Sequence, residues 1–158
     1  MKIDRKESCM EQRKRLNEAS IALIVLVAAD LFCWFGTILS NYIDGTFEKH
    51  LAEDQVAYLP VALVILLVFG AILSGAQIVI GIKGYRNSKN PTGKKGYITA
   101  AKIFWVISVL GVFAYAYAVF TTSGSESLDN GLSAAGAALD VCIYTLFIHA
   151  ANAVHKEA

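Results

Sequence analysis

The sequence predicts an all-α membrane protein, a four-helix antiparallel transmembrane bundle that forms a single domain over residues 1–158. Three observations support this prediction. Of the 158 residues, 56% are hydrophobic and only 17% are charged, whereas soluble domains contain about a quarter charged residues. Four long apolar segments are separated by short polar connections, and the basic residues gather on one side of them. The lipid bilayer is therefore the expected environment.

Each apolar segment is long enough to cross a bilayer, which requires about 20 mostly apolar residues. The predicted spans cover residues 19–43, 58–83, 98–121 and 131–154. The fourth span is rich in Ala and Gly and contains Asp140, so its hydropathy is the weakest. The polar segment 1–18 is too long to begin a cleavable signal peptide, so we expect the first helix to be retained.

The connections between the spans are short and cover residues 44–57, 84–97 and 122–130. Short connections favour antiparallel neighbouring helices. Thirteen of the 14 Lys and Arg residues lie in or beside the N-terminal segment, the middle connection and the C-terminus, and only Lys49 lies on the opposite side. Because cytoplasmic flanks are enriched in Lys and Arg, we expect a multi-pass cell-membrane protein with both termini in the cytoplasm.

The polar segments also carry local structural signals. In the cytoplasmic N-terminal segment, Glu11 and Lys14 each stand four residues before an oppositely charged residue, Arg15 and Glu18 respectively. This spacing predicts ion pairs on a solvated helical extension of the first span. In the connection 44–57, scattered apolar residues predict a short helix lying on the outer surface.

Two intramembrane carboxylates are the sharpest functional candidates. Counted from the predicted span ends at about 1.5 Å per residue, Asp30 and Asp140 lie near mid-bilayer at similar depth. A charged carboxylate at that depth costs at least about 2.5 kcal/mol, so both are expected to face the bundle interior. If the first and fourth helices touch, the pair could share a proton and act in a proton or cation relay, or bind a cationic ligand. The alternative is a pair of protonated, hydrogen-bonded acids that help the helices associate.

Stripes of small and polar residues accompany the aspartates. Asp30 begins one with Trp34, Thr37 and Asn41, the second span carries Gly70, Ser74, Gln77, Gly81 and Gly84, and the fourth carries a stripe from Gly131 through Cys142 and Thr145 to Asn152. We interpret the stripes as packing interfaces, with a polar conduit as the alternative. Asp140 lies on another face of the fourth span. The intramembrane polar candidates are Asp30, Asp140, Gln77, Tyr144 and Thr37.

The span ends carry residues suited to the headgroup region. The middle connection contains no acid, and its basic residues are candidates for binding anionic lipid headgroups: Lys83, Arg86, Lys89, Lys94 and Lys95. Lys102 is expected to extend to the interface as an anchor, and His149 to be a hydrogen-bonded packing residue. Aromatic rings that could sit among headgroups are those of Tyr42, Tyr58, Tyr85 and Tyr97.

Other kinds of site have little support. The three cysteines, Cys9, Cys33 and Cys142, form no CxxC pair, which argues against a disulfide scaffold or a zinc site. Glu48, His50, Glu53 and Asp54 cluster in one connection, but without zinc-type spacing. We therefore expect no metal and no cofactor. A net charge of +1 gives no reason to expect a nucleic-acid partner.

Two functional interpretations remain. The sequence favours a non-enzymatic structural or accessory membrane component, in which the small-residue stripes mediate homo-oligomer formation or binding of a membrane-protein partner. The alternative is a small proton- or cation-coupled transporter or channel that uses Asp30 and Asp140. No nucleophile–base pair or metal constellation is recognisable, so we do not expect an enzyme.

Overall fold

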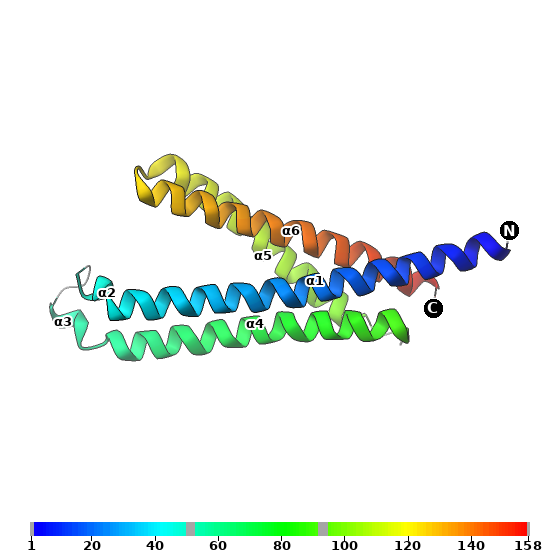
Figure 1. The fold of residues 1–158 in the computed structure, drawn as a ribbon, viewed down its shortest axis with the longest axis horizontal. Coiled ribbons are helices and arrows are strands. Elements are labelled where there is room, and N and C mark those ends of the chain that lie inside the picture. Colours follow the sequence, from blue (N-terminus) through cyan, green and yellow to red (C-terminus); the bar gives the residue numbers. More distant parts are fainter. Residues whose placement is uncertain (1, 50–52, 92–94, 158) are drawn as a thin grey trace.

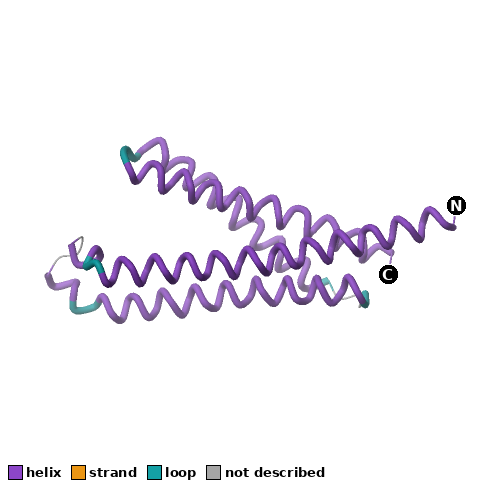
Figure 2. The backbone as a smooth tube through the Cα atoms, viewed as in Figure 1, coloured by secondary structure: helices purple, strands orange, loops and turns teal. Residues whose placement is uncertain are grey.

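The computed structural model describes residues 2–49, 53–91 and 95–157, with side chains described for all of these except 2–9, 48, 53, 54, 125 and 157. Four long helices contain stretches long and apolar enough to cross a membrane. They are α1 (Lys2–Ile43), α4 (Leu59–Lys89), α5 (Gly96–Thr121) and α6 (Ser125–Glu157). Figure 2 shows only helices and loops in the described residues. The prediction of a four-span all-α membrane protein is confirmed.

The helix α1 continues far beyond the predicted first span. Its 42 residues correspond to about 63 Å, twice the roughly 30 Å of a bilayer core. The predicted helical extension is therefore confirmed. The Arg15 guanidinium donates to the Glu11 carboxylate at 2.6 Å, and Lys14 Nζ lies 3.9 Å from a Glu18 carboxylate oxygen.

Two short helices follow α1 where the sequence predicts one. The chain leaves α1 through Gly45, whose φ of +65° is readily adopted only by residues without a side chain. The short helices are α2 (Thr46–Lys49) and α3 (Glu53–Val56). The helix α4 then begins with Pro60 in its first turn, where the missing N–H leaves no helical hydrogen bond unmade.

The other two connections are shorter than predicted. The predicted connection 84–97 is wrong over its first six residues, because α4 continues through Gly84 to Lys89. It ends where Asn90 adopts an extended conformation (φ −132°, ψ 91°), which is the conformation that a following proline, Pro91, favours. Likewise, α6 begins at Ser125, inside the predicted connection 122–130, after a turn at Gly124 (φ +70°). Hydropathy marks the apolar stretch of a helix and not its ends.

The four long helices form two hairpins, α1 with α4 and α5 with α6 (Figure 1). The two hairpins converge at the end that holds both termini and the α4–α5 connection, here called the basic end. They diverge toward the opposite end, which holds α2, α3 and the α5–α6 turn and is here called the acidic end. Between the hairpins, the main contacts join α1 to α6.

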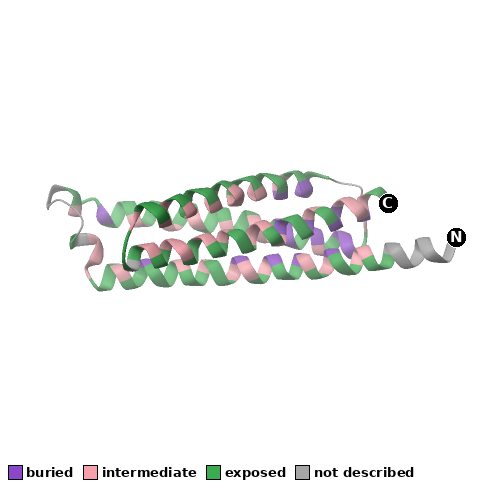
Figure 3. Cartoon of the chain, turned by 90° about the horizontal axis from the view of Figure 1, so that it is seen from above, coloured by how far each residue is buried: buried purple, intermediate pink, exposed green. Residues whose placement is uncertain are grey.

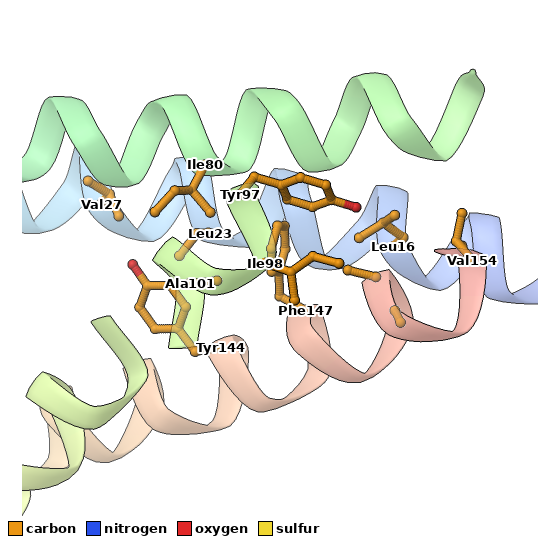
Figure 4. Packing of buried hydrophobic residues seen from close by; sticks show 12 residues of the cluster. Leu16, Leu23, Val27, Ile80, Tyr97, Ile98, Ala101, Tyr144, Phe147 and Val154 are labelled. Atoms are coloured by element: carbon orange, nitrogen blue, oxygen red, sulfur yellow. The ribbon is translucent and has the colours of Figure 1, made fainter. Parts of the chain in front are cut away.

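The hydrophobic core lies in the half of the bundle near the basic end. In Figure 3 most buried residues gather there, and Figure 4 shows the cluster that they form. No described residue of α5 beyond Ala101, and none of α6 before Tyr144, is buried. The core cluster comprises Leu16, Leu23, Val27, Ile80, Tyr97, Ile98, Ala101, Tyr144, Phe147, Ala150, Ala151 and Val154.

Candidate functional site

Asp30 and Asp140 each occupy the first position beyond the core on the seam of their helix. On α1 the buried seam consists of Leu16, Ser20, Leu23 and Val27, at alternating steps of four and three, and the next step is Asp30. On α6 the corresponding seam, followed from the C-terminal end, consists of Val154, Ala151, Phe147 and Tyr144, and its next step is Asp140. Both aspartates therefore mark the level at which the core ends.

The two aspartates lie at the vertex where the hairpins diverge. Asp30 is exposed and Asp140 is half-buried within the chain. The two carboxylates occupy equivalent positions on the buried seams of α1 and α6, and these two helices are in contact. In the described part of the chain no hydrogen bond joins Asp30 to Asp140. The two aspartates therefore occupy the same level of α1 and α6, while their depth in a bilayer and the sharing of a proton stay predictions.

Tyr144 lies one helical turn from Asp140, in the direction of the basic end and the core. Its side chain is only 1% exposed, and its ring is stacked on Phe104 with a centroid distance of 6.3 Å and an interplanar angle of 8°. Among the described residues its buried hydroxyl has no hydrogen-bond partner. Figure 4 shows this hydroxyl directed away from α6 toward α1. A buried hydroxyl without a partner costs about 1–3 kcal/mol, so it is available to a ligand, a proton carrier or water.

Polar residues of α4 lie at the level of the aspartates. The contacts of three α4 glycines fix the antiparallel register with α1: a Cβ added at Gly84 would meet Ser20, one at Gly81 would meet Ile24 and one at Gly70 would meet Trp34. Ser74 is therefore level with Asp30, and Gln77 is one turn closer to the core. Both Ser74 and Gln77 are half-buried.

Ser108 of α5 completes this polar layer and was not among the residues singled out from the sequence. Phe104 stacks on Tyr144, and a Cβ at Gly111 would lie 3.8 Å from Ala137, so Ser108 falls at the level of Asp140. It is half-buried. The available sequence signal was its position seven residues after Ala101, on the same helical face and alone among apolar neighbours.

Thr37 does not add a functional group to this layer. It is exposed, and its hydroxyl donates at 2.9 Å to the carbonyl oxygen of Cys33 in the preceding turn. Intrahelical bonding of this kind satisfies a threonine hydroxyl in lipid. Of the five intramembrane candidates, Asp30, Asp140 and Tyr144 come together. Gln77 lies one helical turn closer to the core, and Thr37 lies apart from the other four.

The stripes differ in their environments. The glycines of the α4 stripe permit close packing, because an added Cβ would collide with Trp34, Ile24 or Phe147. The packing interpretation is confirmed at these positions. The Gly131–Asn152 stripe of α6 is mostly exposed within the chain, and the buried face of α6 is the one that carries Asp140 and Tyr144. Among the described residues of this stripe, Thr145 makes an interhelical hydrogen bond, accepting one from Trp105 Nε1 at 2.9 Å.

The candidate headgroup-region residues near the basic end lie in different environments. Tyr97 is not an interfacial anchor: it is 6% exposed, and its ring meets Phe147 edge to face at 6.0 Å. It lies in the core because the two hairpins converge at this end. The basic residues Lys83, Arg86, Lys89 and Lys95 are exposed, and Lys89 Nζ lies 4.4 Å from the centroid of the Tyr85 ring. Lys94 lies outside the described residues.

The side chains of Glu48, His50, Glu53 and Asp54 lie outside the described residues. Among the side chains that are described, no group of three or more His, Cys, Asp or Glu residues is placed to hold a metal ion.

The arrangement at the vertex is suited to proton or cation chemistry. Two carboxylates at one level can share a proton or coordinate a cation, while serine hydroxyls and a tyrosine hydroxyl can donate or accept hydrogen bonds around it. No protein-family model, curated protein or solved structure is significantly similar to this chain.

Proposed function

We propose that this four-span membrane protein is a proton- or cation-coupled transport protein in which Asp30 and Asp140 carry the transported or coupling charge. The single observation that carries the proposal is their position at the vertex of the two hairpins, each at the first seam position beyond the core. Packed side chains of the core lie on the basic-end side of that place, and the hairpins diverge from it toward the acidic end. Intramembrane carboxylates in such positions commonly line ion or proton pathways.

The free energy needed to place two carboxylates close together in the membrane supports a transport role for Asp30 and Asp140 over a purely structural role. A carboxylate at mid-bilayer costs at least about 2.5 kcal/mol if charged, and two nearby carboxylates also repel one another. A structural pair would offset this cost with a shared hydrogen bond in a closed contact. Asp30 is instead exposed, and no hydrogen bond links it to Asp140 within the described residues. Binding a proton or cation would offset the same cost.

The orientation proposed with this function has the basic end in the cytoplasm. Thirteen of 14 basic residues belong to that end, as the positive-inside rule requires of cytoplasmic flanks. The divergent ends of the hairpins then lie toward the outer side of the cell membrane.

The test is ion flux into proteoliposomes that contain the purified full chain. Proton flux is followed with an entrapped pH-sensitive dye, and sodium and potassium flux with entrapped ion-sensitive dyes. Asp30→Asn and Asp140→Asn keep the side-chain size but remove the charge, so each is expected to abolish flux while helical content and thermal stability persist. Asp129→Asn, which removes an exposed carboxylate near the acidic end, is the matched control and should keep wild-type flux. Absence of wild-type flux, or unchanged flux in both aspartate variants, would overturn the proposal.

A specific observation also supports the second candidate, a non-enzymatic accessory or homo-oligomeric component. The Gly131–Asn152 stripe of α6 is largely exposed, and Cys142 is an exposed free cysteine on it. Small-residue faces allow close helix contacts in lipid. Oxidation of native membranes should then trap a dimer through Cys142, and Cys142→Ser should abolish the dimer while Cys33→Ser retains it. Absence of any cross-linked species would count against this candidate.

A further inference from the structure

A groove on the lipid-facing side of the α5–α6 hairpin, near the basic end, is separate from the aspartate vertex. Its volume is about 490 Å³. Its polar lining comes from Lys102, Thr145, His149 and Asn152, and its apolar lining from Trp105, Val106 and Ile148. We call it the α5–α6 groove. The sequence alone indicated an anchor at Lys102 and a packing residue at His149, without a link between them.

The charge of the α5–α6 groove is uncompensated. Lys102 is exposed and forms no ion pair in the part of the chain that the structure describes. The residues that line the groove include no acid. Asn152 and His149 add hydrogen-bonding groups beside the ammonium, and His149 is exposed and not a hydrogen-bonded packing residue among the described side chains. A phosphate ester is the anionic group that complements this combination of a cation and neutral donors.

The polar and apolar parts of the groove are arranged by depth. Lys102 and Asn152 lie within about one helical turn of the predicted span ends at residues 98 and 154. Trp105 and Val106 lie further along α5, toward the middle of the bundle. The Trp105 indole donates to Thr145 Oγ1 at 2.9 Å, which fixes the ring against α6. The groove therefore has a charged part nearer the basic end, at headgroup level, and an apolar part further from that end, at acyl-chain level.

We propose that the α5–α6 groove binds one anionic phospholipid from the leaflet at the basic end. The headgroup phosphate accepts from Lys102 and the neighbouring Asn152, and an acyl chain lies against Trp105 and Val106. Charge complementarity, lipid exposure and the depth of each part all match this one occupant. A small soluble anion would leave the apolar part unfilled. This site is distinct from the exposed basic residues Lys83, Arg86 and Lys89, which lie on α4.

The test compares lipid retention by the purified full chain in detergent, measured by native mass spectrometry, using phosphatidylglycerol and phosphatidylcholine as probes. The wild-type protein should retain one phosphatidylglycerol in preference to phosphatidylcholine. Because one basic residue near a membrane surface contributes about 1 kcal/mol, Lys102→Gln should weaken phosphatidylglycerol binding roughly fivefold. The matched control is Lys14→Gln, an exposed lysine at the same end of α1 that does not line the groove, and it should change binding less than twofold.

A second variant tests the apolar part of the groove independently. Val106→Trp adds bulk to an exposed, lipid-facing position, so it should leave folding intact while excluding the acyl chain and reducing retention of phosphatidylglycerol. Equal loss with Lys102→Gln and Lys14→Gln would overturn the proposal in favour of diffuse charge attraction. Equal retention of both lipids would overturn the phosphate assignment. Competition by millimolar glycerol phosphate or inorganic phosphate would overturn it in favour of a free-anion site.

Discussion

At the scale of single residues, the position of a polar side chain along a packing seam decides whether it belongs to the core or to the candidate site. Ser20 and Asp30 lie on the same seam of α1. Ser20 is fully buried because its hydroxyl donates at 2.6 Å to the Leu16 carbonyl oxygen, so it needs no other partner. Among the described residues Asp30 has no equivalent internal partner for its charge, and it lies where the opposing hairpin diverges. The same face of one helix thus provides both core and candidate site.

Gly84 provides a test of close helix packing at a single position. A Cβ at Gly84 would collide with the Phe147 ring and the Ser20 hydroxyl, whereas one at Gly75 would meet no atom within 4 Å. Both Gly84→Ala and Gly75→Ala raise helix propensity by up to about 1 kcal/mol. Only Gly84→Ala also overpacks the core, at a cost of about 1–3 kcal/mol. We therefore expect thermal unfolding in detergent to occur at a lower temperature for Gly84→Ala than for Gly75→Ala, and equal unfolding temperatures would contradict this packing.

At the scale of elements, the two hairpins are held together in different ways. The α1–α4 hairpin relies on glycines that bring the helix backbones close. The α5–α6 hairpin relies on aromatic stacking and on the bond from Trp105 to Thr145, and near the acidic end on a bond from Asn130 Nδ2 to Thr122 Oγ1 at 3.1 Å. We therefore expect an interhelical hydrogen bond to contribute measurably to the unfolding free energy of the α5–α6 hairpin.

The contribution of the Trp105–Thr145 bond can be isolated with a double-mutant cycle. Trp105→Phe removes the indole donor, and Thr145→Val removes the acceptor with little change in shape. Interhelical bonds in membranes contribute about 0.6–2 kcal/mol, so we expect the two single variants to be non-additive by that amount. Unfolding free energies in micelles measure the effect. Additive losses would show that the bond does not couple α5 to α6.

At the scale of the whole molecule, the asymmetric core predicts asymmetric motion. Buried contacts between the hairpins gather near the basic end, whereas their acidic ends diverge (Figures 1 and 3). Regions with few buried contacts open at lower free energy than a packed core. The basic end should therefore act as a hinge, and the charges of Asp30 and Asp140, repelling one another at the vertex, should favour the divergent arrangement.

Spin-label distances can test this hinge in lipid nanodiscs, in a chain whose native cysteines are replaced. One label pair at Ile43 and Ser123 reports on the acidic end, and a pair at Met10 and Lys156 reports on the basic end. The Asp30→Asn/Asp140→Asn double variant removes the repulsion, so the first pair should move closer while the second stays unchanged. A fixed distance at the acidic end would contradict the hinge. Equal movement at both ends would contradict a packed pivot.

Much of the fold was determined by local features of the sequence. Four apolar runs longer than a bilayer is thick predicted the four long helices, because a membrane-spanning backbone must satisfy its hydrogen bonds internally. Four-residue spacing predicted the Glu11–Arg15 and Lys14–Glu18 pairs. Counting residues from the span ends also placed Asp30 and Asp140 at one depth, because the rise of a helix is constant.

Which helix faces meet was decided only by the tertiary structure. In lipid, both the inner and the outer faces of a helix are apolar, so hydrophobic periodicity does not mark the buried side as it does in water. Nothing in the sequence therefore separated the buried Tyr144 face of α6 from its exposed Cys142 face, or placed Tyr97 in the core. The membership of Ser108 in the polar layer and the divergence of the hairpins at the aspartates likewise depend on contacts between residues far apart in the chain.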